Sequence, residues 1–551
     1  MIIDANSHSN SEIETDICIV GAGAAGITIA NEFLSSQRNI LVVESGGQKL
    51  NKDLNDLFVG EIGSNKLHPP ISLYRRRVLG GTTSVWGGRC VPYDDIDFET
   101  RDYIPNSGWP ITLKDLIPYY IRANELCEAG AYEYTTKETF GDNTKDFIPG
   151  FISDSIKTDS LERFSKPTDF GKRYQNIFKA RDNLNLLCNA TCTKIAVNKY
   201  ANSVSGLELK TLDHREIKIK AKHYVLAMGG LETPRLMLAS NDILSNGVGN
   251  NNDNVGRYYM SHLSDNSASV AFDKKITNII YDYERTTDDI YCRRRLSINP
   301  KFQHSNKVGN FIARLHYPKA WDPSHGNGIL SALYLAKALI QLEYRTAFSN
   351  NTWGKNSDKT KTPNIWPHIT NVVSDLPATI NFAQKILRRR ILADRKLPSV
   401  TLKGNNNTYT LDVNAEQSPN PNSRITILEK KDKLGVPRIK VDWQTNDLDL
   451  HTVKRSLEII GEDLKHQSIG ELHLDPNNIQ LRAQGGHFIG TTRMSDNIEN
   501  GVVDSNCKVF GLDNLYIAGS SVFCTSSHAN PTLTIVALSL RLADHMRAAR
   551  R

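Results

Sequence analysis

The pattern of apolar and polar positions in the first fifty residues predicts a strand–helix–strand unit. A short apolar run at Thr15–Val20 predicts a buried strand that leads directly into the glycine-rich loop Gly21–Gly26. A helical pattern follows as far as Phe33, and a second apolar strand at Ile40–Val43 ends in Glu44. Strand, loop, helix, second strand and terminal acid in one short unit are typical of a dinucleotide-binding α/β fold.

Further along the chain, the pattern predicts more strands of the same sheet and a second domain. Leu184–Ile195 predicts strand and turn, and Ala221–Leu226 predicts a buried strand before a helix from Thr233. The least regular stretch, from about 266 to 475, is expected to form most of a substrate domain. Within it, Lys403–Asn407 predicts a hairpin-type turn between alternating runs, which indicates an antiparallel sheet.

Near the C-terminus, two segments carry candidate chemistry. Gln484–Met494 places His487 beside glycines, where a substrate could approach the backbone closely. Farther on, Asn530 and Pro531 predict a helix start, as N-cap and first helical residue, before an apolar-periodic run to Met546. The free N–H groups of such a helix end favour an anion.

Composition excludes several classes of function. The 551 residues include 67 basic and 60 acidic side chains, a net charge of +7 that does not indicate nucleic-acid binding. Eight scattered cysteines show no C-x-x-C or Cys/His spacing, so no metal site is expected, and a reduced, cytoplasmic location is favoured. The polar first ten residues and the lack of long apolar runs predict neither a secretory signal nor a transmembrane helix.

Two stretches of the middle region leave a membrane-surface contact open. Ser331–Tyr344 is apolar-periodic, and Lys385–Lys396 is basic and amphipathic. They favour either a weak contact with anionic lipid or two ordinary surface helices, and the second interpretation is the more common one for soluble proteins.

The two glycine-rich loops together favour a flavin. Gly21–Gly26 permits a tight turn and close approach of a pyrophosphate, and Glu44 is placed to accept from a ribose hydroxyl, which fits both FAD and NAD. The second loop, Gly80–Gly88, contains Trp86 and suits a long cofactor with a flat ring at its far end. The alternative for this second loop is an irregular turn with Trp86 as core filler.

With these loops in view, the chain resembles the glucose–methanol–choline (GMC) oxidoreductases. The resemblance rests on ordered blocks at both ends and in the middle of the chain. Its histidine–asparagine combination looks closest to the pyranose oxidase-like and cholesterol oxidase-like branches, of which the pyranose oxidase-like one is preferred. Besides the segments above, the blocks are Gly108–Ile111, Asn189–Thr191, Val225–Arg235, Asn254–Arg257, Glu416–Gln417, Pro419–Arg424 and Leu434–Arg438.

The resemblance implies FAD and a set of residues that contact it. It places the backbone of Cys192 at the adenine, whereas the residues alone indicate only a buried thiol. The expected cofactor-binding residues are Gly21, Gly23, Ala24, Ala25, Gly26, Glu44, Ser45, Gly80, Gly81, Thr82, Thr83, Val85, Trp86, Gly87, Gly88, Cys192, Ala227, Gly229, Gly519, Ser520, Pro531 and Thr532.

Two departures from the family pattern refine this expectation. Members with covalent flavin use a histidine in the Gly80–Gly88 region, where this chain has Val85 and Trp86, so non-covalent FAD is expected. Ile517–Phe523 lacks the aspartate that often precedes the serine, which leaves one ribityl or phosphate contact without its usual residue.

The resemblance also implies the catalytic pair. His487 matches the catalytic histidine and is expected to remove the hydroxyl proton, because imidazole accepts protons near neutral pH. Asn530 matches the second member and is expected to hold the substrate oxygen, with hydride passing to flavin N5. The helix from Pro531 would stabilise the negative charge on the reduced ring. His528 has no counterpart in the motif and is expected to line the entrance or to cap structure.

Together these features predict an α/β, Rossmann-like FAD-binding domain and an α+β substrate domain on an antiparallel sheet. The expected FAD-binding segments are 1–98, 172–265 and 482–551, with 99–171 and 266–481 in the substrate domain. The expected substrate is a small alcohol, by preference a secondary hydroxyl of a sugar or glycoside, with oxygen, a quinone or a protein carrier as electron acceptor. The alternatives are a sterol or other non-sugar alcohol, an NAD-linked dehydrogenase, and a flavoprotein without turnover.

Overall fold

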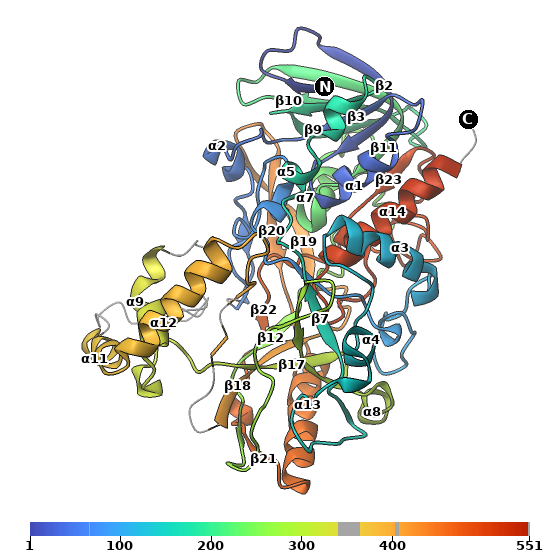
Figure 1. Cartoon of the computed structure of the whole chain (residues 1–551). Coiled ribbons are helices and arrows are strands. Elements are labelled where there is room, and N and C mark those ends of the chain that lie inside the picture. The colour runs from blue at the N-terminus through green and yellow to red at the C-terminus, as the bar shows by residue number, and fades with distance from the viewer. Residues whose placement is uncertain (66, 340–363, 400, 403–406, 549–551) are drawn as a thin grey trace.

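Two large β-sheets organise the molecule, one in each half (Figure 1). The computed structural model describes residues 1–65, 67–339, 364–399, 401–402 and 407–548. Apolar side chains pack into a separate large core around each sheet. The sequence-based fold class, a Rossmann-like domain beside a domain built on an antiparallel sheet, is confirmed.

The first sheet contains the predicted strand–helix–strand unit. Its strand order is β1-β8-β3-β2-β11-β10-β9, with β23 beside β11, and its central strands β3, β2 and β11 run parallel. Each strand predicted at this end of the chain is present, and β2 and β11 are longer than predicted. The strands are β1 (Ile2–Asp4), β2 (Glu12–Val20), β3 (Ile40–Val43), β8 (Leu184–Cys188), β9 (Thr191–Val197), β10 (Val204–Lys210), β11 (Glu216–Leu226) and β23 (Leu515–Ile517).

Three helices form a layer on this half of the molecule. Helix α14 (Thr532–Ala548) packs against both α1 (Ala24–Glu32) and α3 (Leu113–Leu126) (Figure 1). Because α1 follows the first glycine loop and α14 follows the Asn530 segment, this packing brings the two ends of the chain together.

Helix α7 (Gly229–Ala239) begins four residues before the predicted start at Thr233. Pro234 directly follows the predicted start, and in the structure it lies inside the helix. Proline has no N–H, so the carbonyl of Gly230 loses its usual helical donor. The hydroxyl of Thr491 replaces this donor at 2.7 Å, which allows the helix to extend toward the cavity.

The second sheet is antiparallel in every pairing recorded among the described residues. Its order is β21-β13-β18-β17-β16-β6, with β12 and β22 joined through β18, and the long helix α13 (Asp447–His466) packs against it. The strands are β6 (Ile156–Lys157), β12 (Leu263–Asp265), β13 (Ser269–Phe272), β16 (Leu296–Ile298), β17 (Phe311–His316), β18 (Thr408–Ala415), β21 (Gly470–His473) and β22 (Arg482–Ala483).

Two of the predicted domain boundaries cut this second sheet. Strand β12 pairs with β18 and β22, although the boundaries at 265 and 482 place β12 and β22 in the FAD-binding segments. At these two points the predicted boundaries pass through the second sheet. The domain boundaries stay a prediction.

Smaller elements complete the fold. Two short sheets have the orders β14-β15-β7-β5 and β19-β20-β4. Their strands are β5 (Arg89–Cys90), β7 (Leu161–Phe164), β14 (Glu284–Arg285), β15 (Tyr291–Arg294), β4 (Glu61–Ile62), β19 (Arg424–Lys431) and β20 (Pro437–Asp442), and the remaining short helices are α2 (Lys52–Asp56), α4 (Thr136–Phe140), α5 (Phe170–Tyr174), α6 (Ile177–Ala180) and α8 (Pro300–Asn306).

A group of helices projects from one side of the molecule (Figure 1). It consists of α9 (Gly328–Leu335), α11 (Trp366–Ser374) and α12 (Leu376–Ile386), followed by a π-helical turn at Leu387–Ile391. Of the predicted apolar run from Ser331 to Tyr344, the structure shows α9 and a 3₁₀ turn at Ala336–Leu339, and the rest lies outside the described residues. Most of the predicted Lys403–Asn407 turn lies outside them as well.

The basic stretch in this group has contacts within the molecule. Lys385 lies 3.4 Å from the carboxylate of Asp282, and Arg390 donates to the carbonyls of Leu397 and Pro398. These contacts fit the interpretation as ordinary surface helices. In the part of the chain that the structure describes, no helix combines the length and apolar character that crossing a membrane requires.

Replacing Thr491 by valine is expected to destabilise the protein, because the carbonyl of Gly230 then has neither its helical donor nor a substitute. We expect a loss of about 1–3 kcal/mol in the free energy of unfolding, the cost of one buried unsatisfied polar group. Thermal unfolding of the Thr491→Val variant measures the effect.

The double variant Thr491→Val/Pro234→Ala is the control. Alanine restores an N–H four residues after Gly230, so the destabilisation by Thr491→Val should be smaller in this background. An equal loss in both backgrounds would contradict the assignment.

Candidate active site

A cavity of about 1870 Å³ lies between the two halves and gathers most of the predicted site residues. It is far larger than the roughly 300–1,000 Å³ of a typical small-molecule site, so it has room for a long cofactor and a substrate. The predicted residues that line it are Gly21, Gly23, Ala24, Ala25, Glu44, Ser45, Gly81, Thr82, Thr83, Val85, Trp86, Gly87, Cys192, Ala227, Gly229, His487, Gly519, Ser520, Asn530, Pro531 and Thr532.

Three predicted glycines, Gly26, Gly80 and Gly88, lie behind this lining rather than in it. A Cβ at Gly26 would stand 1.9 Å from the carbonyl oxygen of Gly21, so this glycine permits close packing of loop and helix. Gly80 has φ +91°, which favours glycine, and its N–H donates to the carbonyl of Ala22 at 2.8 Å. The two glycine loops are therefore in direct contact and face one cavity.

Glu44 is held in place by backbone donors. Its carboxylate accepts from the N–H of Ala22 at 2.9 Å and from the N–H of Gly46 at 2.8 Å, while burial raises its pKa. A carboxylate has about four acceptor positions, so these two bonds leave capacity for a ribose hydroxyl.

The arginines beside the second loop are paired with a buried acid. Arg75 and Arg77 each lie 2.7 Å from Glu232, and Arg77 also donates to the hydroxyl of Ser45 at 2.8 Å. Despite the cost of its burial, these guanidinium groups and Arg235 hold the pKa of Glu232 well below its ordinary value. The cluster fixes the cavity wall around Ser45.

His487 and Asn530 meet in the cavity although 43 positions separate them in the chain. The Nε2 atom of His487 lies 3.2 Å from the amide nitrogen of Asn530. The other amide atom, Oδ1 of Asn530, is buried and has no hydrogen-bond partner among the described residues. A base and an unsatisfied polar group are thus placed side by side.

This contact corrects the predicted helix start. Helix α14 begins at Thr532, one residue after the predicted Pro531, and the carbonyl of Pro531 accepts from the N–H of Ile535 at 2.9 Å. Asn530 is therefore not the N-cap, because its side chain is turned toward His487. The start of the helix still lines the cavity, through Pro531 and Thr532.

On its other side, His487 contacts a second histidine that the sequence did not single out. Nδ1 of His487 and Nδ1 of His262 are 2.8 Å apart, and Nε2 of His262 lies 2.9 Å from the carbonyl oxygen of Ser526. Burial is the main cause that lowers the pKa of His487 well below its ordinary value and the pKa of His262 to about 3. Both rings are therefore neutral at neutral pH.

His528 lies outside the cavity lining, among buried polar side chains. Its Nε2 is 2.9 Å from the carboxylate of Asp94, and Nδ1 is 3.4 Å from the guanidinium of Arg295. This position contradicts a role at the entrance and fits the structural alternative. Among the described residues, no group of three or more His, Cys, Asp or Glu side chains is arranged to hold a metal.

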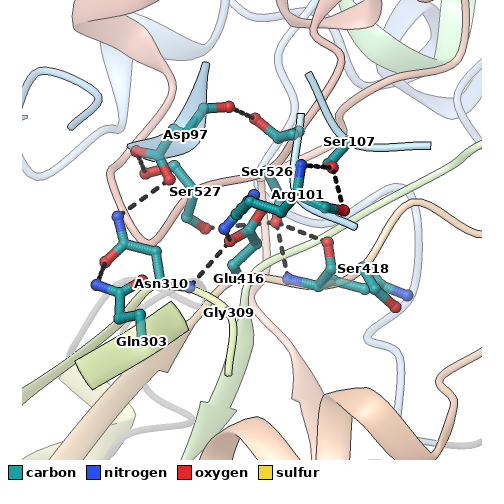
Figure 2. A network of polar contacts seen from close by, with 12 residues as sticks. Asp97, Arg101, Ser107, Gln303, Gly309, Asn310, Glu416, Ser418, Ser526 and Ser527 are labelled. Atoms are coloured by element: carbon teal, nitrogen blue, oxygen red, sulfur yellow. Dashed lines mark hydrogen bonds and ion pairs between the residues drawn. The ribbon is translucent and has the colours of Figure 1, made fainter. Parts of the chain in front are cut away.

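A buried polar layer, formed by Asp97, Arg101, Glu416 and Gln417, supports the turn that carries Ser526 and Ser527 (Figure 2). Ser527 donates to Asp97 at 2.6 Å, and the hydroxyl of Ser526 accepts from the N–H of Gln417 at 2.8 Å. Next to them, Arg101 and Glu416 form a buried two-bond pair at 2.6 and 2.8 Å. These contacts therefore fix the backbone three and four residues before Asn530.

The cavity fits FAD by its shape and its backbone. A Cβ added at Gly23 or at Gly229 would meet no atom within 4 Å, so both glycines face open space where a phosphate chain could approach. The N-terminus of α1 lines the same region through Ala24 and Ala25, and a helix N-terminus favours an anion. The FAD site and the His487–Asn530 pair thus belong to one continuous cavity.

This fold and this site define a flavin-dependent oxidoreductase, and comparison with known proteins gives its family. Residues 174–264 match the N-terminal and residues 419–539 the C-terminal model of the GMC oxidoreductases. The chain belongs to the GMC oxidoreductase family and is an FAD-dependent alcohol oxidoreductase. The pyranose oxidase-like branch stays a prediction.

Similar proteins cover the chain almost completely at low identity. The fructose dehydrogenase large subunit of Gluconobacter japonicus is 20% identical and covers 97% of this chain and 98% of its own length. The paromamine 6'-oxidase of Streptomyces fradiae is 20% identical, with 96% and 90% covered. The crystal structure of formate oxidase shares the fold, with a TM-score of 0.52 at 17% identity and 98% and 99% of the two chains covered.

Replacing Gly23 by valine is expected to weaken FAD binding while leaving the apoprotein folded. The added side chain enters the open space of the cavity, where it would displace a phosphate. Because one hydrogen bond to a charged group is worth about 1.5–3 kcal/mol, we expect an increase in Kd of at least about tenfold. Titration of the apoprotein with FAD, followed by flavin fluorescence, measures it.

The thermal midpoint of the FAD-free protein is the control, since it should change little in Gly23→Val. Unchanged FAD affinity in a folded Gly23→Val protein would show that this loop does not hold the cofactor.

Proposed function

We propose that the protein oxidises a secondary hydroxyl of a sugar or glycoside to the carbonyl. The observation that carries the proposal is the His487–Asn530 pair in the cavity, with a neutral imidazole at 3.2 Å from the amide. FAD, when bound, supplies the acceptor for the hydride that leaves the alcohol carbon. The residues of the chain supply the base, the orientation of the substrate and the exclusion of water.

In this proposal His487 accepts the hydroxyl proton at Nε2. Removing this proton breaks the O–H bond, and the alkoxide that forms is a far better hydride donor than the alcohol. A neutral base is ready for this step, since the lowered pKa keeps His487 unprotonated.

Asn530 orients the substrate oxygen. Its amide nitrogen donates to His487 Nε2, and in the complex the same N–H can turn to the alkoxide oxygen. Its unpaired Oδ1 offers an acceptor to a second substrate hydroxyl. A vicinal diol, as in a pyranose ring, matches one donor and one acceptor on the same amide.

Polar residues of the second sheet favour a substrate with several hydroxyl groups. Ser264, Asn266, Thr410 and Asp412 line the cavity on the substrate-domain side. Among the similar proteins, fructose dehydrogenase and paromamine 6'-oxidase carry carbohydrate-type substrates in their names. The C-glycoside 3-oxidase of Arthrobacter globiformis does too, at 28% identity over a match that covers 20% of this chain and 21% of its own length.

A second candidate, a sterol or another apolar alcohol, is favoured by a different part of the lining. Helices α9 and α12 contribute Ile329, Leu333, Phe382 and Ile386 to the outer part of the cavity. These side chains would equally contact the apolar aglycone of a glycoside, which reconciles them with the first proposal.

For the cofactor and the electron acceptor we propose the following. FAD is held non-covalently, because Val85 and Trp86 occupy the second loop where covalent members carry a histidine, and acid precipitation would then release all of the flavin. Oxygen, a quinone and a protein carrier are the candidate acceptors.

Replacing His487 by alanine is expected to slow anaerobic flavin reduction by about 10²–10⁴-fold, the usual contribution of a general base, with FAD still bound. In the wild type, activity requires unprotonated His487. Since burial lowers its pKa, the acid limb of kcat/KM should lie clearly below the value of about 6.5 of a free histidine. Stopped-flow reduction at varied pH measures both.

A His487→Ala protein that binds FAD and is reduced at the wild-type rate would remove His487 as the base. The exposed histidine His214, replaced by alanine, is the control and should leave both the rate and the acid limb unchanged.

A substrate panel separates the two candidate functions. We expect flavin bleaching under anaerobic conditions by pyranoses or glycosides such as D-glucose and methyl β-D-glucoside. The panel also contains cholesterol and benzyl alcohol. Bleaching by these two alone would exclude the sugar proposal and support the second candidate.

A further inference from the structure

We propose that His262 is a positioning residue that fixes the tautomer of His487, so that the lone pair of Nε2 faces the cavity. The inference rests on the proposed role of His487 as the base and goes beyond it. It follows from a chain of three contacts that joins Ser526, His262, His487 and Asn530.

The direction of the hydrogen bonds begins at Ser526. A carbonyl oxygen can only accept, so Nε2 of His262, at 2.9 Å, must carry a proton and donate it to Ser526. The hydroxyl of Tyr93 donates to the same oxygen at 2.8 Å. Both lone pairs of this carbonyl are therefore in use, and its position is fixed.

Neutral His262 then has a bare Nδ1. This atom lies 2.8 Å from Nδ1 of His487, so His487 must carry its own proton on Nδ1 and donate it. In neutral His487 this leaves Nε2 unprotonated, at the position where Asn530 donates from 3.2 Å. The opposite tautomer would place two bare nitrogens against each other, which is unfavourable.

The surroundings hold His262 in this arrangement. The ring is fully buried, and its backbone carbonyl accepts from the N–H of Gln484 at 3.0 Å, next to strand β12. Ser526, labelled in Figure 2, is bound through its hydroxyl to the backbone of Gln417 in the buried polar layer. The tautomer of the base is thus set by a layer that never touches the substrate.

Neighbouring arginines and histidines lower the pKa of the two rings further, in the same direction as burial. His262, Arg89 and Arg314 lower the pKa of His487 after burial, and Arg89, Arg314 and His528 do so for His262. Arg89 and Arg314 are both paired with Glu162, at 3.4 and 2.6 Å, so a carboxylate placed at 262 would add a negative charge that acts directly on His487.

Three variants of His262 test the inference through the rate and the pH dependence of flavin reduction. His262→Phe keeps a ring but has no acceptor, so His487 is free to adopt the wrong tautomer. We expect a loss on the order of 10²-fold, less than the roughly 10⁴-fold known for an enforced wrong tautomer. His262→Asn offers a neutral acceptor and should recover the rate to within about tenfold of wild type.

His262→Asp is the matched partner of His262→Asn, because it offers an acceptor of the same shape with a negative charge. An anion next to an imidazole favours its protonated form, so the acid limb should move up by about one pH unit or more. The buried His68, which bonds the Pro69 carbonyl and the Tyr259 hydroxyl at 2.6 and 2.7 Å, provides the control. His68→Asn should lower the melting temperature without moving the limb.

Selective ¹⁵N labelling of histidine gives a readout that needs no substrate. The signals that are lost in the His487→Ala variant assign the ring nitrogens of His487. In the wild-type protein these signals should show a protonated Nδ1 and an unprotonated Nε2. In His262→Phe they should show a mixture of the two tautomers. For the flavin-reduction kinetics of the His262 variants, the substrate is D-glucose or the alcohol of the panel that reduces the flavin fastest.

The outcomes separate this inference from the proposed function. If His487→Ala keeps full activity, the base assignment is wrong. If His487→Ala is inactive but His262→Phe reacts at the wild-type rate, the tautomer inference is wrong. It is also wrong if the Phe, Asn and Asp variants of His262 are equally slow and the acid limbs of their pH profiles lie at the same pH. Should His262→Phe fail to fold, identical acid limbs in the Asn and Asp variants still overturn it.

Discussion

The buried pair between Arg101 and Glu416 is the contact on which the active-site geometry depends. Both side chains are excluded from water, and removing either partner of such a pair costs about 3–5 kcal/mol because the other charge is left alone. Glu416 follows strand β18 of the second sheet, and its carboxylate also accepts from the N–H of Asn310 at 2.9 Å. The pair therefore connects the segment around residue 101 to the end of strand β18 in the second sheet.

From this pair, polar contacts extend toward His487 and Asn530, the proposed catalytic pair. Asp97, four residues before Arg101, accepts from Ser527 and from Asn310 at 2.6 and 3.0 Å, and burial raises its pKa. Because Ser526 and Ser527 lie four and three residues before Asn530, the position of the amide depends on charges that were taken out of water during folding. A buried polar layer of this kind favours one arrangement over others, since any shift leaves a group unsatisfied.

The sequence predicted the strands of the first sheet well and those of the second sheet poorly, and the reasons are physical. Gly21–Gly26 and Glu44 form a local unit whose spacing determines its geometry, and His487 and Asn530 stood in recognisable segments. The sequence did not single out His262, which lies five residues after the segment Asn254–Arg257, because its proposed role arises only when the start of β12 lies beside Ser526. Asn530 was mistaken for an N-cap since the competing acceptor, 43 positions away, is not visible in a local pattern.

The proposed base, His487, must be kept neutral and oriented at once, and different atoms meet the two requirements. Burial with nearby cations keeps His487 unprotonated, but burial alone does not decide which nitrogen carries the single proton. A carboxylate partner would orient the ring and also raise its pKa, which would favour the protonated and inactive form at low pH. A neutral histidine as partner orients the ring through one hydrogen bond while adding no negative charge, so the two properties are set independently.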